Sequence, residues 1–353
     1  KPKPAYLLDR GEYDKRKEEV PRAVPGFLPP LPEGEPVNRL GLARWLLTPE
    51  QPLFARVTVN RFWQQYFGTG IVETSEDFGS QGAFPSHPAL LDWLAVHFRE
   101  SGWDAKAMQK LIVTSATYRQ ASNITPQSYE RDPENRLLAR GPRYRLDAET
   151  IRDTMLAAGG LLVERIGGPS VKPYQPSGVW EAVGYSGSNT VRFKRDTGDG
   201  LYRRSLYTFW KRTAPPPSMR VFDAPSRETC SVRRSRTNSP TAALNLMNDE
   251  QYVEAARHLA ARVVAEGGDD LESRLRFAFR LCTARTPSEQ ELKIMAEAYR
   301  RQLERFESNP EAADKLLVVG ESPRAEVMEK PQHAAWTMVA NMLLNLDETI
   351  SKQ

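Results

Sequence analysis

The sequence predicts a mainly α-helical fold in which two helical parts flank a long irregular segment. Apolar residues recur at helical spacing over residues 38–163 and again over residues 237–353, with capping residues before several of these runs. Residues 164–236 lack that periodicity and are rich in Gly, Pro, Ser and aromatic residues. We therefore expect one compact, bundle-like domain with an irregular basic and aromatic insert that holds at most a short β element.

The N-terminal part is expected to begin with a strap and continue into helices. Residues 1–37 are rich in proline and show little periodicity, which favours an extended strap lying on a surface. From Asn38 the pattern becomes helical. Thr48-Pro49-Glu50-Gln51 predicts a capping box for the next helix, because Thr is followed by Pro at the first helical position.

Three further helix starts are predicted before the insert. Ser86-His87-Pro88 precedes a run of leucines at helical spacing, and Asp104 is a suitable N-cap for the next run. A fourth helix is expected after Asp147, and Gly167-Gly168-Pro169 should end it.

Helices are expected to resume after the insert and to continue to the C-terminus. Asn238-Ser239-Pro240 predicts the first start, and Asp249 predicts the second. Further helices are expected over residues 271–281, after the capping box Thr286-Pro287-Ser288-Glu289, and over residues 334–346. Residues 1–37, 38–163, 164–236 and 237–353 are thus the expected parts of the chain.

The insert carries an unusual concentration of positive charge. Residues 192–236 hold twelve Lys or Arg against four acids, a net charge of +8, whereas the whole chain has a net charge of +4. One interpretation is that buried arginines pair with acids and pin down the loop. The other is a surface that meets anions; nucleic acid is disfavoured as the anion because no nucleic-acid-binding motif accompanies the charge. A short strand is expected at residues 204–210.

The predicted ligand-binding residues follow from the chemistry of guanidinium groups and aromatic rings. Arginine grips carboxylate, sulfate or phosphate with a planar fork of donors, and aromatic faces stack on sugar rings. The residues expected to bind the acid groups are Arg203, Arg204, Lys211, Arg212, Arg233, Arg234 and Arg236. The residues expected to stack are Trp180, Tyr185, Tyr207 and Trp210. The helix start at Asn238 adds backbone N–H donors.

Asp223 and Cys230 are the candidates for a reactive group, and the sequence leaves open whether the chain is an enzyme. Cys230 lies among Arg227, Arg233 and Arg234, and neighbouring cations favour the reactive thiolate. A buried inert thiol and a disulfide with Cys282 are the alternatives. No histidine or cysteine spacing predicts a metal site.

Two further features limit the class of protein. The chain has no run of about 18 apolar residues, so the sequence predicts no membrane span. It also has no Cys-x-x-Cys-His motif, so we expect no covalently bound haem or other cofactor in this chain.

The chain resembles, nearly end to end, the planctomycete PSD domain of unknown function. That domain is found at the C-terminal side of planctomycete cytochrome c domain-containing proteins. The resemblance is carried by a series of motifs in order, among them Asn60-Arg61-Phe62-Trp63, Asp77-Phe78-Gly79, Ser101-Gly102-Trp103, Arg145-Leu146-Asp147-Ala148-Glu149 and Leu344-Asn345-Leu346-Asp347-Glu348.

The resemblance implies an exported, periplasmic or secreted protein with haem c on an upstream domain. Family members are often encoded near sulfatase-like and carbohydrate-degrading proteins, and no catalytic residues are established for them. The first functional hypothesis is therefore a module that binds, with or without processing it, an anionic polysaccharide such as a sulfated one. The second is a non-catalytic helical scaffold that docks a cytochrome c domain of the same polypeptide or complex.

Overall fold

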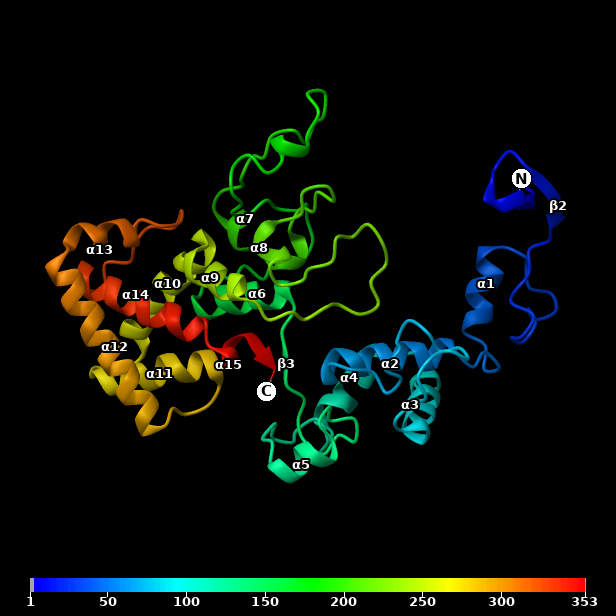
Figure 1. Ribbon diagram of the computed structural model, residues 1–353, viewed down its shortest axis with the longest axis horizontal. Coiled ribbons are helices and arrows are strands. Elements are labelled where there is room, and N and C mark those ends of the chain that lie inside the picture. The colour runs from blue at the N-terminus through cyan, green and yellow to red at the C-terminus, as the bar shows by residue number, and fades with distance from the viewer. Residues whose placement is uncertain (1–2, 353) are drawn as a thin grey trace. The chain divides into compact units, whose positions relative to one another are not determined.

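The computed structural model describes residues 3–352, and the chain divides into two compact units, Lys1–Pro142 and Arg143–Gln353 (Figure 1). The division follows Pro142, whereas the sequence placed the expected parts of one domain at residues 1–37, 38–163, 164–236 and 237–353. The predicted fold class is confirmed, because helices dominate both units and the two sheets have two short strands each.

The first unit consists of a hairpin and five helices. In chain order these are β1 (Ala5–Leu8), β2 (Arg16–Val20), α1 (Arg39–Leu46), α2 (Phe54–Phe67), α3 (Pro88–Glu100), α4 (Ala105–Thr114) and α5 (Pro126–Arg131). The core of this unit forms where α2 packs on α3 and α4. Trp63 and Phe67 lie one turn apart on α2, and their rings stack at 4.2 Å between centroids.

The helix starts of the first unit agree with the sequence at three of four places, since the Asn38 side chain also caps α1. α3 begins at Pro88, and the Asp104 carboxylate caps α4 by accepting from the backbone N–H of Ala107. The capping box predicted at Thr48 is wrong. α2 begins at Phe54, and the Gln51 side chain accepts from the backbone N–H groups at its start instead.

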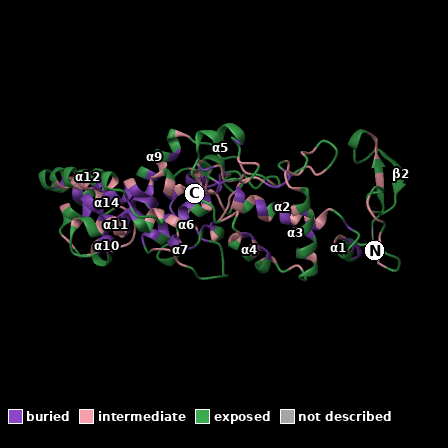
Figure 2. Ribbon diagram, turned by 90° about the horizontal axis from the view of Figure 1, so that it is seen from below, coloured by how far each residue is buried: buried purple, intermediate pink, exposed green. Residues whose placement is uncertain are grey.

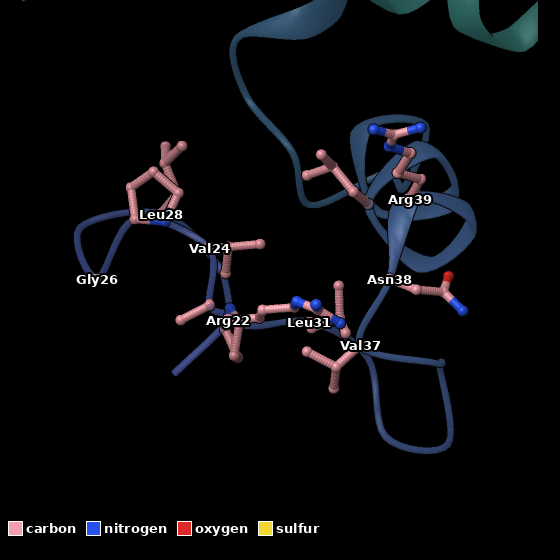
Figure 3. A pocket seen from close by; sticks show the side chains of 12 residues that line it. Arg22, Val24, Gly26, Leu28, Leu31, Val37, Asn38 and Arg39 are labelled. Carbon is pink, nitrogen blue, oxygen red and sulfur yellow. The ribbon is translucent and has the colours of Figure 1, made fainter. Parts of the chain in front are cut away.

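The strap contains regular structure as well as irregular backbone. Strands β1 and β2 pair antiparallel, and residues 21–38 form turns and irregular backbone before α1. Figure 3 shows Val24, Leu31 and Val37 around one space beside the start of α1. We call this space, of about 1010 Å³, the strap groove; its lining is Arg22, Ala23, Val24, Pro25, Gly26, Leu28, Pro30, Leu31, Val37, Asn38, Arg39 and Leu42.

The second unit consists of helices around the insert and one short sheet. Before and within the insert lie β3 (Tyr144–Arg145), α6 (Ala148–Ala158), α7 (Asp199–Tyr202) and α8 (Pro217–Arg220). After it come α9 (Pro240–Asn248), α10 (Glu250–Glu266), α11 (Leu271–Thr283), α12 (Glu289–Ser308), α13 (Pro310–Leu317), α14 (Lys330–Leu344), α15 (Asp347–Ile350) and β4 (Ser351–Lys352).

The core of the second unit lies between α10, α12 and α14. Buried residues are concentrated on α10 and α14, whereas α12 is mostly exposed, as Figure 2 shows. Alanines on α10, among them Ala255, Ala256 and Ala260, are fully buried, and small side chains let neighbouring helices approach closely. Gly159, just after α6, also needs its lack of a side chain, because a Cβ there would lie 2.7 Å from the Ala255 carbonyl oxygen.

Most helices of the second unit begin where the sequence predicted. The Ser239 hydroxyl caps α9, and the Asp249 carboxylate caps α10. α12 has a capping box, although it is formed by Ser288 and Glu291, two residues after the predicted pair. α6 ends at Ala158, well before the predicted stop at residues 167–169.

The insert has no strand at residues 204–210, so that prediction is wrong. Residues Ser205–Tyr207 form a 3-10 turn, and the insert takes part only in isolated bridges, Val163 with Arg203 and Val171 with Thr208, within the described chain. The backbone N–H of Ser205 donates to the Asp153 carboxylate at 2.7 Å instead of to a neighbouring strand. Side chains of the helices therefore take the place of a sheet partner.

No helix within residues 3–352 combines the length and the apolar character that crossing a bilayer requires.

Candidate functional site

Arg152 of α6 anchors the insert on the helical core. Its side chain is only 1% exposed. Nη1 donates to the Arg203 carbonyl oxygen at 2.9 Å and to Ser205 Oγ at 3.1 Å. Nη2 donates to the Leu201 carbonyl oxygen at 2.6 Å, and Nε donates to Gln251 Oε1 at 2.7 Å. Because each nitrogen has an acceptor, the cost of burying this charge is offset by hydrogen bonds.

Arg203, a predicted ligand-binding residue, is a second buried anchor. Its Nη2 donates to the carbonyl oxygens of Arg165 at 2.7 Å and Gly167 at 2.6 Å. Nη1 donates to the Pro169 carbonyl oxygen at 3.2 Å, and the guanidinium lies 3.8 Å from the centroid of the Tyr207 ring. These contacts correct the predictions for Arg203 and Tyr207. The Arg203 guanidinium is buried, and it covers the Tyr207 ring that was expected to stack on a sugar.

Glu254 of α10 joins the insert to the loop after α13. Its carboxylate is fully buried, and it accepts from the hydroxyls of Tyr174 at 2.8 Å and Tyr202 at 2.9 Å, and from the Ser322 N–H at 2.8 Å. Arg257 Nη2 lies 3.6 Å away and balances its charge. Burial, with the negative charge of Glu254, raises the pKa of Tyr202 to about 12, so this hydroxyl stays a donor at neutral pH.

Trp180 and Lys211 also face inward. Trp180 is 2% exposed, with Phe193 and Phe209 against its ring. Lys211 Nζ lies 5.0 Å from the centroid of that ring and donates to the Thr190 carbonyl oxygen at 2.8 Å. The prediction that Trp180 stacks on a sugar ring is therefore corrected: its faces are covered by the protein. Tyr185, by contrast, is exposed.

Arg234 is paired with the start of α6. Its Nη1 lies 2.6 Å from Glu149 Oε2 and 3.8 Å from an Asp147 oxygen. Burial alone would raise the pKa of Glu149, but the hydrogen bonds from Arg234 bring that pKa below its ordinary value. Arg227 lies 3.8 Å from the same carboxylate and 4.3 Å from the centroid of the Trp210 ring, so it covers one face of this predicted stacking residue.

Asp223, a candidate for the reactive group, ties the loop after α8 to β3 and to the approach of α9. Its Oδ2 accepts from Arg145 Nη2 at 2.5 Å and from the Thr237 N–H at 2.8 Å, and the Thr237 hydroxyl donates to both oxygens. The backbone at Asp223 has φ 58°, in the left-handed region that Asp tolerates better than most residues. The carboxylate is thus committed to a structural clasp.

Cys230, the other reactive candidate, is exposed rather than buried, and it forms no disulfide with Cys282. Cys282 is half-buried on α11, and burial raises its thiol pKa to about 12, which keeps it protonated and inert. Within residues 3–352 no cluster of three or more His, Cys, Asp or Glu is arranged to hold a metal ion.

The other predicted arginines differ in how tightly they are held. Arg204 is exposed, with its Nε 3.7 Å from an Asp153 oxygen. The Arg236 guanidinium lies 4.3 Å from the centroid of the Tyr144 ring, and Arg233 is likewise engaged within the protein. Asn238 is exposed just before α9, and Ser239 rather than Asn238 is the cap.

One concavity brings two of the predicted residues together. It has a volume of about 480 Å³ and is lined by Arg212, Thr213, Pro215, Arg220, Asp223, Ala224, Ser226 and Ser235. We call it the Arg220 basin. Sequence reasoning missed Arg220 as a site residue, because a single arginine after a proline run carries no spacing signal. Arg203, Trp180 and Arg234 do not line it.

Comparison with known proteins gives a family and nothing further. Residues 38–299 match the family model PSD1, described as a protein of unknown function (DUF1553). That range includes the whole insert and most of the helical core of both units. No curated protein and no solved structure matched the chain.

Proposed function

We propose that this chain, which belongs to the PSD1 family of proteins of unknown function, is a non-catalytic helical interaction domain. The observation that carries the proposal is the internal pairing of the arginines in the matched region. Arg203 donates to three carbonyl oxygens, and Arg234 pairs with Glu149. Both candidate reactive groups fit this function, since Asp223 is held in a clasp and Cys230 has no hydrogen-bonded base within the described chain.

The strap groove supplies a surface for a partner. Most of its lining is apolar, and Val37 and Leu42 are exposed to solvent there. Arg22 and Arg39 also line it. This chemistry favours a segment with apolar side chains flanked by acidic ones. The partner that we propose is a cytochrome c domain of the same polypeptide or complex, in an exported protein, as the family resemblance implies.

The test is binding of that cytochrome domain to a groove variant. We expect Val37→Asp with Leu42→Asp to weaken binding at least about 10-fold, because charges would replace apolar contact area in the groove. Both side chains are exposed, so the variant should fold. Isothermal titration calorimetry of the purified chain with the cytochrome domain gives the dissociation constant.

The matched control is Val318→Asp, which places the same charge at an exposed site of the second unit. The control should bind as the unaltered chain does. Equal affinity of the groove variant and the control would show that the partner does not use the groove. Absence of any binding by the unaltered chain would contradict the proposed function itself.

Binding of an anionic polysaccharide remains a second candidate function, but fewer of the predicted residues are available to bind the ligand. Arg204, Arg212, Tyr185 and Asn238 are predicted residues that are exposed and remain open to such a ligand. Retention on a sulfated-glycan column that disappears when Arg204 and Arg212 are changed to Ala would favour this candidate over the scaffold.

A further inference from the structure

The Arg220 basin carries positive charge that the protein does not use. Arg220 is exposed, and its side chain has no hydrogen bond or ion pair with any other residue that the structure describes. Arg212 is 63% exposed and meets Glu228 only at 3.6 Å, a loose pair of the kind that contributes little in water. The basin therefore differs from the interior of the insert, where both Nη atoms of Arg203 already have carbonyl acceptors.

The carboxylate in the basin does not cancel this charge. Asp223 lines the basin, but Arg145 pairs with it at 2.5 Å, and Thr237 supplies two further donors. The Asp223–Arg145 pair is neutral as a unit. Arg220 is then a positive charge in the lining with no carboxylate partner among the described residues, and Arg212 has only the loose pair with Glu228.

Hydroxyl groups complete the set of donors. Thr213 and Ser235 line the basin, and neither hydroxyl makes a hydrogen bond within residues 3–352. Two guanidinium forks with two hydroxyl donors suit a ligand that presents several oxygen acceptors and negative charge. Pro215 and Ala224 add little apolar surface, so the body of the ligand should be polar.

The frame of the basin is held in place before any ligand arrives. Beneath it Met219 and Phe222 are buried in the core, and the Asp223 clasp holds the turn that follows α8. On the next side, Trp210 Nε1 donates to the Ser226 carbonyl oxygen at 3.1 Å. A preformed site loses less conformational freedom on binding than a mobile loop does.

We propose that the Arg220 basin binds a phosphate monoester carried on a small polar molecule such as a sugar. At neutral pH a phosphate monoester carries close to two negative charges, since its second pKa is about 6, and this suits the unpaired Arg220 together with the loosely paired Arg212. A sulfate monoester or a carboxylate carries only one. The volume of about 480 Å³ is in the usual range for small-molecule sites. The basin belongs to the second unit and the strap groove to the first, and the proposal does not depend on the proposed docking.

The experiment compares three sugars of matched size by isothermal titration calorimetry at low salt and about pH 7.5, where the second phosphate proton is lost. Glucose 6-phosphate should bind at least about 10-fold more tightly than glucose 6-sulfate, because hydrogen bonds between charged groups strengthen with ligand charge. Glucose should not bind measurably. Equal affinities for the two esters, or no binding of glucose 6-phosphate, would overturn the proposal.

Variants of the basin test its location. Arg220→Gln should weaken glucose 6-phosphate binding at least about 10-fold. Glu228→Gln should strengthen it by about 2- to 5-fold, because Arg212 loses its competing carboxylate. Arg301→Gln, at an exposed position on α12, is the matched control and should bind unchanged. Equal loss in Arg220→Gln and Arg301→Gln, or weaker binding by Glu228→Gln, would place the ligand elsewhere.

Discussion

The inner side and the outer rim of the insert use the same residue type in opposite ways. On the inner side, Arg152 and Arg203 are buried and donate to backbone carbonyl oxygens from the insert itself. On the rim, Arg212 and Arg220 are exposed. Arg212 forms a loose ion pair with Glu228, and Arg220 forms none within the described residues. A carbonyl acceptor adds no negative charge, so an inner arginine can be satisfied in hydrogen bonds without a carboxylate partner.

This difference explains why a net charge of +8 in one segment does not form one large basic surface. Part of the charge is used to hold irregular backbone against helices, where no sheet is available to accept or donate. Buried backbone groups must find partners, and a long loop has few of its own. Arginine suits this task because one side chain reaches several carbonyl groups.

The largest effect is expected when an inner arginine is removed. Arg152→Ala should lower the free energy of unfolding by about 3–5 kcal/mol, because the Leu201 and Arg203 carbonyl oxygens and Gln251 lose their buried donor. Arg212→Ala, the matched change on the rim, should alter it by less than about 0.5 kcal/mol. Urea unfolding followed by circular dichroism gives both values.

Arg152→Ala and Arg212→Ala remove the same type of side chain, so the difference between their free energies of unfolding reports the effect of burial. Similar losses of stability for Arg152→Ala and Arg212→Ala would show that burial does not separate the two regions. A stable Arg152→Ala protein would show that the insert is held by its apolar contacts alone.

A smaller change in the free energy of unfolding should come from pH, through the histidine His258 on α10. His258 contacts Ser322 Oγ at 2.7 Å, and burial, with the nearby positive charge of Arg257, lowers its pKa from 6.5 to about 4. As the pH falls, the His258 ring is therefore protonated at a higher pH in the unfolded chain than in the folded one. His258 therefore contributes stability that is present above about pH 6.5 and is lost as the pH falls toward 4.

The variant His258→Gln isolates this contribution. Between pH 6.5 and pH 4 it should lose about 1–2 kcal/mol less stability than the unaltered chain, a discounted figure because the ring is half-buried. Free energies of unfolding at the two pH values supply the measurement. Identical pH dependence in the two proteins would mean that His258 accepts its proton in the folded state.

The fold class and most helix starts could be predicted because they depend on local sequence. Asp104, Ser239 and Asp249 cap the helices that follow them, and each carries its signal within four residues. The expected strand at residues 204–210 failed for a non-local reason. Alternating apolar residues need a neighbouring strand, and here Ser205 donates to Asp153 of α6 instead.

The buried hydrogen bonds of Arg152 and Glu254 were harder to predict from the sequence. Arg152 and Glu254 lie within helices, where a charged residue normally indicates a solvated face. A signal was present for Arg152: Ala148 and Leu156, four residues to either side, are both buried, so the arginine lies on an apolar stripe. Nothing local identifies Tyr174 or Ser322 as partners of Glu254, because they lie 80 and 68 residues away in sequence.

Hydrogen exchange of backbone amides in the insert tests whether the inner arginines anchor it. If inner arginines anchor the insert, the amides of Val171, Ser205 and Phe209, which donate to the Tyr207 carbonyl, the Asp153 carboxylate and the Val171 carbonyl, should be protected nearly as well as those of α10. Amides of residues 226–233 on the rim should exchange quickly. If the two sets of amides exchanged at the same fast rate, the inner arginines would not anchor the insert.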